Sequence, residues 1–170
     1  VDKEIKPYVN DWDEEGRAPW ELHQKAGALG VWGFGIDERY GGLGEDDSFL
    51  IAIYNEEFAK CGAGGVGAAM GGRMISLEPI QRLCSTEIKD RVLKDIVTGK
   101  KGSSLGITEP GGGSDVANIK TTAKRDGNHF VINGSKTFIT GAMTSDYFVV
   151  GARTGGEGLT GISLFFVEAD

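Results

Sequence analysis

The residues best placed to do chemistry form one glycine-rich stretch, Thr108-Glu109-Pro110-Gly111-Gly112-Gly113-Ser114-Asp115. Consecutive glycines let backbone N–H groups converge on one point, which suits a bound phosphate, and the Ser114 hydroxyl adds a donor at the rim. Glu109 and Asp115 would repel a phosphate unless they point away or pin the loop by accepting backbone N–H bonds. The stretch matches neither a Walker loop nor a dinucleotide fingerprint. A phosphate-binding loop and a plain glycine loop therefore both stay open as interpretations.

The other chemically capable side chains are scattered along the sequence. The two histidines, His23 and His129, fall in different predicted domains, so we expect neither a metal site nor a catalytic triad through Ser114. Cys61 and Cys84 are too few for a disulfide framework or a zinc site, and we expect them to be small hydrophobic residues on helices.

Composition narrows the class of protein. The chain has 28 glycines among 170 residues but no Gly-X-Y repeat, and 39% of its residues are hydrophobic, which excludes collagen and disorder. Its net charge of −7 argues against a nucleic-acid partner, which requires a basic face. No run of about 18 apolar residues predicts a membrane span, and no signal peptide is visible.

The elements that would position the glycine-rich stretch differ between the two halves of the chain. Residues 1–101 show helical spacing: Pro19 suits a first helical turn, Asp46-Asp47-Ser48 predicts a helix cap, and a helix begins at Thr86 and ends at Gly99. These positions predict an all-α domain over residues 1–101.

One predicted helix, residues 64–78, is unusually rich in glycine. Each interior glycine lowers helix stability by roughly 1 kcal/mol relative to Ala. Such a helix usually lets a neighbour approach its backbone closely, and that neighbour is another helix or a ligand. We expect Pro79 to break or kink it.

Residues 102–170 instead read as short strands, predicted over residues 119–125, 130–132, 136–140, 147–152 and 161–167. Asp126-Gly127 predicts a turn, and Asn133-Gly134 gives the strongest hairpin signal in the chain. Strands at this spacing without intervening helices favour an antiparallel β-barrel or sandwich, and we expect a barrel that is incomplete because no closing element follows the last strand. The expected fold class is therefore α+β, with a helical domain at 1–101 and a β-barrel domain at 102–170.

The glycine-rich stretch, followed at hairpin distance by Asn133-Gly134-Ser135-Lys136-Thr137-Phe138-Ile139-Thr140, resembles the acyl-CoA dehydrogenase family. The resemblance extends back through Tyr40-Gly41-Gly42-Leu43-Gly44 and forward through Ala152-Arg153-Thr154. It covers essentially the whole chain, which would correspond to the family's N-terminal helical domain and middle β-domain.

The resemblance implies an FAD site. The flavin would be lined by Leu105-Gly106-Ile107-Thr108, with the Thr108 hydroxyl at its pyrimidine edge. Gly113 and Ser114 would face the pyrophosphate, and Ser114 would also neighbour the thioester of the acyl-CoA substrate. Phe138-Ile139-Thr140 would lie against the isoalloxazine, with Thr140 near N5 and Phe138 standing where many members have Trp.

The resemblance also implies a role for the helix at 64–78, because the corresponding helix of the family lines the acyl-chain pocket. Gly67, Ala68 and Gly71 would remove side-chain volume there, while Met70 or Met74 could supply a soft apolar wall. We therefore expect a roomy pocket for a long or branched acyl chain.

The activity that the resemblance implies is oxidation of the Cα–Cβ bond of an acyl-CoA to the trans-2-enoyl-CoA, with electrons passing to an electron-transfer flavoprotein. Family members are more than twice as long as this chain. Their C-terminal helical bundle carries the glutamate base that removes the α-proton, while the β-hydride passes to flavin N5, and it forms much of the homotetramer or homodimer interface. That bundle is absent here, so no catalytic residue is assigned. We expect the chain alone to be inactive and to retain FAD weakly or not at all.

The implied compartment is the cytoplasm of a bacterium or the mitochondrial matrix of a eukaryote. Two alternatives stay open. A flavin-dependent monooxygenase or a nitroalkane oxidase shares this scaffold, and a non-catalytic flavin- or acyl-binding module would have the same first two domains.

Overall fold

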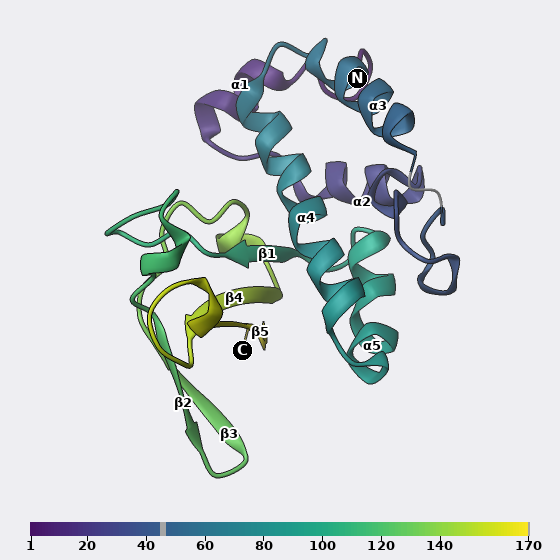
Figure 1. The fold of residues 1–170 in the computed structure, drawn as a ribbon. Helices are drawn as coiled ribbons and strands as arrows, with labels where there is room; N and C mark the ends of the chain where they lie inside the picture. The colour runs from purple at the N-terminus through teal and green to yellow at the C-terminus, as the bar shows by residue number, and fades with distance from the viewer. Residues whose placement is uncertain (45–46, 170) are drawn as a thin grey trace. The chain divides into compact units, whose positions relative to one another are not determined.

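The computed structural model describes residues 1–44 and 47–169, apart from the side chain of Arg73. The chain divides into two compact units, Val1–Gly102 and Ser103–Asp170. The first contains the helices, drawn purple to teal in Figure 1, and the second contains the strands, drawn green to yellow. Each unit is described by itself below.

The first unit is all-α. Its helices are α1 (Val9–Glu15), α2 (Trp20–Ala28), α3 (Ser48–Ala59), α4 (Gly64–Leu83) and α5 (Thr86–Val97). Two short 3₁₀ turns, Val31–Gly33 and Glu38–Tyr40, connect α2 to the loop before α3. The core is built from apolar side chains of several of these elements, including Trp32, Ile80, Val92, Leu93 and Ile96, all fully buried.

Helix α5 forms where its sequence signals predict it. The Ser85 hydroxyl accepts a hydrogen bond from the backbone N–H of Ile88 at 3.4 Å, which caps the first turn. Gly99 follows the helix with φ 73°, a conformation that favours glycine. The predicted cap of α3 is confirmed for Asp47, whose carboxylate accepts from the N–H of Phe49 at 2.8 Å, while Asp46 lies outside the described residues.

Helix α4 does not end at Pro79, as the sequence analysis allowed, but continues to Leu83. A proline within a helix removes one backbone hydrogen bond. Here Leu77 and Ile80 on either side of Pro79 are 2% and 0% exposed. Burial of these side chains holds the turn helical because packing outweighs local propensity.

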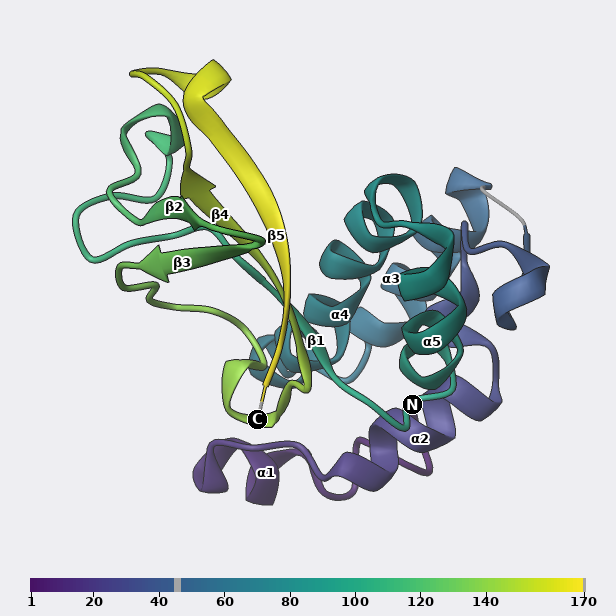
Figure 2. The same cartoon turned by 90° about the horizontal axis from the view of Figure 1, so that it is seen from below.

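The second unit contains one mixed sheet of β1 (Ser103–Gly106), β2 (Thr122–Asp126), β3 (His129–Asn133), β4 (Tyr147–Arg153) and β5 (Ile162–Glu168). The strand order is β1-β4-β2-β3, and β5 pairs with β4. Strands β2 and β3 are antiparallel, as are β4 and β5, which pair from Tyr147↔Glu168 to Arg153↔Ile162. Figure 2 shows the long β5 ribbon running beside β4.

The prediction of an antiparallel barrel is therefore wrong. Strand β4 pairs in parallel with β1 along Ser103↔Tyr147 to Gly106↔Val150, and with β2 at Thr122↔Arg153, and the sheet is not closed. Parallel neighbours need a connection of a dozen or more residues. The segment between β1 and β4 is long enough to return the chain to the same end of the sheet, although it contains no α-helix.

The hairpin also lies elsewhere than at its strongest sequence signal. Strands β2 and β3 are joined at Asp126-Gly127, the predicted turn, where Gly127 has φ 57°. Asn133-Gly134 ends β3 instead, and residues 136–140 form no strand. A Cβ at Gly134 would lie 2.3 Å from Thr121 Oγ1, so this glycine permits a close backbone approach rather than a tight turn.

Candidate functional site

The glycine-rich loop after β1 is a tight, solvent-facing turn. The N–H of Glu109 donates to the carbonyl of Gly112 at 3.0 Å, and the N–H of Gly112 donates back to Glu109 at 3.1 Å. Residues 110–115 are exposed. Within the part of the chain that the structure describes, the backbone N–H groups of Gly111, Gly113 and Ser114 donate to no protein acceptor. The loop therefore presents three unused donors to solvent, next to the Ser114 hydroxyl.

The carboxylate of Glu109 is turned into the protein. The residue is 8% exposed. Its Oε2 accepts from the N–H of Lys120 at 2.5 Å, and its Oε1 accepts from the N–H of Thr121 at 2.8 Å and from Lys136 Nζ at 2.8 Å. Burial alone would raise the pKa of Glu109, but hydrogen bonds from Lys136, Thr121 and Lys120 outweigh it and lower the pKa to about 2. The carboxylate thus pins the loop by accepting backbone N–H bonds.

Asp115, the second acidic residue of the loop, is engaged differently. Its Oδ2 accepts from Asn118 Nδ2 at 2.6 Å within the short 3₁₀ turn Val116–Asn118. Both carboxylates that could repel a phosphate are therefore tied to protein donors.

The segment 136–140 runs along the end of β1 and the loop that follows it. Lys136 Nζ donates to the carbonyl of Ile107 at 2.9 Å, and the N–H of Thr137 donates to the carbonyl of Thr108 at 3.0 Å. At the other end of the segment, Ser104 Oγ donates to the carbonyl of Thr140 at 2.7 Å. The structure thus brings the predicted residues of the glycine-rich stretch and of Phe138-Ile139-Thr140 together.

Phe138 combines an exposed aromatic ring with an unusual backbone conformation. It is 91% exposed and has φ 54°, the only positive φ of a non-glycine residue in the described ranges. A bulky residue in the left-handed region is strained, and such strain persists only where neighbouring bonds hold the backbone. The bonds from Lys136 and Thr137 supply that constraint on one side, and the bond from Ser104 to Thr140 supplies it on the other.

The remaining predicted residues divide by exposure. Gly106 is buried inside the sheet, where a Cβ would lie 3.7 Å from Val150 Cγ2, while Leu105 and Ile107 are half-buried. Gly113 lies beside Thr108, since a Cβ on it would be 3.4 Å from Thr108 Cγ2. Sequence reasoning missed the contribution of Lys136, whose only signal was its place two residues before Phe138.

A separate apolar cavity of about 660 Å³ lies between α3 and α4 in the helical unit. Its walls include Ile51, Tyr54, Phe58, Gly67, Gly71 and Met74. A Cβ at Gly71 would meet nothing within 4 Å, and one at Gly67 would meet only the Phe58 ring, at 3.6 Å. These two glycines widen the cavity rather than admit another helix.

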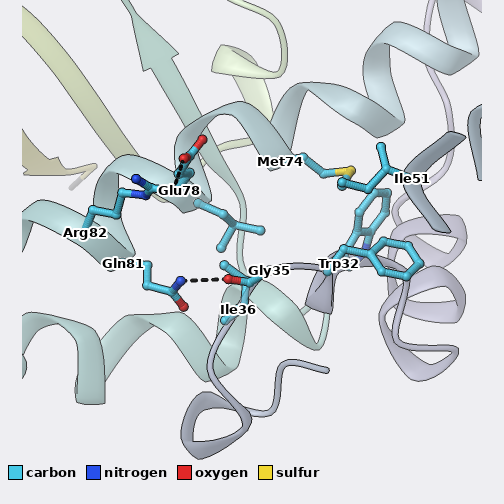
Figure 3. Close-up of a pocket in the computed structure, with 10 residues that line it drawn as sticks. Trp32, Gly35, Ile36, Ile51, Met74, Glu78, Gln81 and Arg82 are labelled. Carbon is cyan, nitrogen blue, oxygen red and sulfur yellow. Dashed lines mark hydrogen bonds and ion pairs between the residues drawn. The ribbon is translucent and has the colours of Figure 1, made fainter. Parts of the chain in front are cut away.

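A smaller cavity of about 160 Å³ adjoins the first and shares Ile51 and Met74 with it (Figure 3). Gln81 fixes one wall, because its Nε2 donates to the carbonyl of Gly35 and its Oε1 accepts from the N–H of Asp37, both at 2.8 Å. The Glu78–Arg82 ion pair, 2.9 Å long, lies at the rim.

The described residues contain neither a metal-binding cluster nor a membrane-spanning helix. No group of three His, Cys, Asp or Glu side chains there could hold a metal ion. No helix in the same ranges has the length and apolar character needed to cross a membrane.

Comparison with family models gives two adjoining matches. The model of the acyl-CoA dehydrogenase N-terminal domain matches residues 1–100, and that of the acyl-CoA dehydrogenase middle domain matches residues 104–170. The chain belongs to the acyl-CoA dehydrogenase family.

Individual members of the family are similar to this chain over nearly its whole length. The mitochondrial long-chain specific acyl-CoA dehydrogenase of Sus scrofa is 37% identical over 169 residues, covering 98% of this chain and 39% of the relative. A solved structure of a probable acyl-CoA dehydrogenase from Mycobacterium abscessus has a TM-score of 0.92 and 38% identity, covering 99% of this chain and 45% of that one. A glutaryl-CoA dehydrogenase from Mycobacterium smegmatis, solved with FADH2, has a TM-score of 0.77 and 29% identity, covering 99% and 42%. The chain thus spans less than half the length of these family members.

Proposed function

We propose that this chain forms the helical domain (1–101) and middle β-domain (102–170) of an FAD-dependent acyl-CoA dehydrogenase. The proposed reaction is oxidation of the Cα–Cβ bond of an acyl-CoA thioester to the trans-2-enoyl-CoA. FAD, when bound, supplies the acceptor for the two electrons removed. One observation carries the proposal: the same β-unit presents both unused backbone donors in its glycine-rich loop and an exposed aromatic ring at Phe138. The family's two domain models match the chain over residues 1–100 and 104–170.

The loop has the chemistry that a pyrophosphate requires. The N–H groups of Gly111, Gly113 and Ser114 have no protein acceptor among the described residues and can donate to an anion, and Ser114 adds its hydroxyl. Lys136 compensates the charge of Glu109, so that carboxylate does not oppose an anion at the loop. Gly113 and Ser114 would therefore face the pyrophosphate, and Ser114 would also neighbour the CoA thioester.

The segment beside the loop has the chemistry that a flavin ring requires. Phe138 offers an exposed flat apolar surface, and the half-buried Ile139 would add a further apolar contact. Leu105, Gly106 and Ile107 would contribute backbone groups along the flavin, and the hydroxyls of Thr108 and Thr140 would bond its polar edge.

The cavity between α3 and α4 supports an acyl-chain site. Its walls are mostly apolar, and it is widened where Gly67 and Gly71 carry no side chain. Burial of methylene groups in such a cavity is favourable by about 0.8 kcal/mol each. We therefore propose a long or branched acyl group as the substrate of the whole protein.

No residue of this chain is assigned as the base that removes the α-proton. Glu109 is unsuited to that role, because a carboxyl with a pKa of about 2 accepts protons poorly and this one is buried. We place the base, the remaining FAD contacts and the homotetramer or homodimer interface in the part of the family's length outside residues 1–170. The electrons would leave to an electron-transfer flavoprotein, in the bacterial cytoplasm or the mitochondrial matrix.

A substrate comparison with the whole protein tests this function. The flavin-loaded protein is mixed with acyl-CoA thioesters of graded chain length and a dye acceptor, and enoyl-CoA formation is measured by chromatography. We expect enoyl-CoA in amounts equal to the dye reduced. Oxidation of nitroalkanes without acyl-CoA turnover would favour the nitroalkane oxidase alternative. Flavin binding with no turnover of either substrate would favour the non-catalytic module.

A further inference from the structure

The Glu109–Lys136 ion pair is largely buried, with side chains 8% and 13% exposed. Both partners make additional bonds: Glu109 accepts from two backbone N–H groups of the segment before β2, and Lys136 donates to the carbonyl of Ile107. One Lys side chain therefore joins the end of β1, the glycine-rich loop and the segment 136–140.

The geometry points to Lys136 as a positioning residue that holds Phe138 and Thr140 at the flavin ring through its bonds to Glu109 and Ile107. This inference rests on the proposed function, since it assumes that the segment contacts FAD. The Lys136 side chain is 13% exposed and its Nζ bonds to Glu109 and to the carbonyl of Ile107, so it need not touch the cofactor.

The need for such a device follows from the backbone. Residues 136–140 form no strand, so no ladder of hydrogen bonds fixes their register. The bonds that tie this segment to residues 104–109 are those of Lys136 Nζ, Thr137 N–H and Ser104 Oγ. Of these four hydrogen bonds, two are donated by Lys136 Nζ. Because their donor is charged, these two are the stronger ones. Phe138, held at φ 54° between them, would relax to a commoner conformation without that constraint.

The experiment compares flavin-loaded variants of the whole protein. Lys136→Gln removes the charge, and Lys136→Arg keeps it. The matched control is Lys124→Gln, which removes an exposed Lys on β2. Each variant is measured for FAD affinity by flavin fluorescence and for the visible circular dichroism of bound flavin, which reports the ring's surroundings. Far-ultraviolet circular dichroism checks folding.

We expect K136Q to weaken FAD binding by about tenfold or more and to change the visible dichroism. K136R should restore affinity to within about threefold of wild type, and K124Q should match wild type. A folded K136Q protein with wild-type affinity and dichroism overturns the inference. A wild-type protein that binds no flavin instead overturns the proposed function, so the two failures are distinct.

K136Q leaves the buried Glu109 carboxylate without its charged partner, which can prevent folding. A second variant tests the inference in that case. Ser104→Ala removes the hydrogen bond to the carbonyl of Thr140, at the other end of the segment, together with the 2.7 Å hydrogen bond between Ser104 Oγ and Ser145 Oγ. We expect a folded protein with altered visible dichroism and FAD affinity lowered about threefold to tenfold. Unchanged dichroism and affinity in folded S104A would overturn the inference in that case.

Discussion

The backbone carbonyl of Thr108 accepts a hydrogen bond from the backbone N–H of Thr137 at 3.0 Å. This bond joins the two stretches of sequence on which the resemblance to acyl-CoA dehydrogenases rested. Thr137 stands between Lys136 and Phe138 in the chain, so this bond and the Glu109–Lys136 ion pair together join the segments that we propose to hold FAD.

Stability at low pH should depend on Glu109. Its pKa falls from 4.5 to about 2 in the folded protein, so the carboxylate stabilises the fold fully above pH 4.5 and loses that contribution as pH falls toward 2. Denaturant unfolding across this range should show a loss on the order of 3 kcal/mol from this group.

Two variants test the assignment to Glu109. Glu109→Gln should be destabilised by about 3 kcal/mol at neutral pH, and its deficit should shrink as pH falls below 4.5. Glu157→Gln, at an exposed position of the same unit, should follow the wild-type curve. An unchanged pH dependence in E109Q would show that Glu109 is not the titrating group.

Gly134 should be intolerant of a side chain. A Cβ there would lie 2.3 Å from Thr121 Oγ1 and 2.6 Å from Thr121 Cα, and backbone atoms cannot give way cheaply. Gly134→Ala should lower the free energy of unfolding by about 2 kcal/mol. Gly156→Ala, where a Cβ would meet nothing within 4 Å, should change it by less than about 0.5 kcal/mol. Equal stabilities of the two variants would contradict the close approach at Gly134.

The same glycine shows where sequence reasoning about the fold succeeded and failed. Helix α5 was predictable because a cap at Ser85 and the periodicity of Val92, Leu93 and Ile96 are local signals. Asn133-Gly134 was misread as a hairpin, since a glycine required by a turn and one required by a neighbour's backbone look alike in sequence. The parallel pairing of β1 with β4 was missed because it depends on the path of a long connection.

Gly71 should lower the stability of α4 and at the same time enlarge the cavity. It lies within α4 with open space at its Cβ position. Gly71→Ala should therefore stabilise the helix by about 0.5–1 kcal/mol, because alanine has the higher helix propensity. The added methyl group enters the cavity, so kcat/KM for long or branched acyl-CoA should fall more than for short ones.

Unfolding and chain-length kinetics of the whole protein measure both effects in one variant. Gly65→Ala is the control, since Gly65 lies in the first turn of α4 but does not line this cavity, and a Cβ there would lie 3.4 Å from Asp13 Oδ1. A strict preference of the wild-type enzyme for four-carbon substrates would contradict the roomy pocket.

Ser114 should contribute to FAD retention. Its hydroxyl lies at the rim of the loop, beside the unused N–H donors, with no protein partner among the described residues. Ser114→Ala in the whole protein should therefore lower FAD affinity by roughly fivefold, the effect of one hydrogen bond. Ser48→Ala removes an exposed serine of the helical unit and should leave affinity unchanged. Equal flavin occupancy of S114A and wild type would remove Ser114 from the phosphate site.

The glycines and the serine of the proposed site could be predicted from sequence, whereas its buried ion pair could not. A run of glycines before a serine indicates accessible backbone donors, so Gly113 and Ser114 were candidates for binding a phosphate group. The partnership of Glu109 with Lys136 was not visible, because a buried ion pair between residues far apart in the chain leaves no periodicity. Only the possibility that Glu109 pins the loop could be stated beforehand.

Anaerobic titration of the purified whole protein with an acyl-CoA tests the central claim most directly. We expect the isolated protein to show the absorbance of oxidised flavin, which a long or branched acyl-CoA bleaches and which is weaker in K136Q and S114A. A folded whole protein that neither carries nor takes up FAD would contradict this claim.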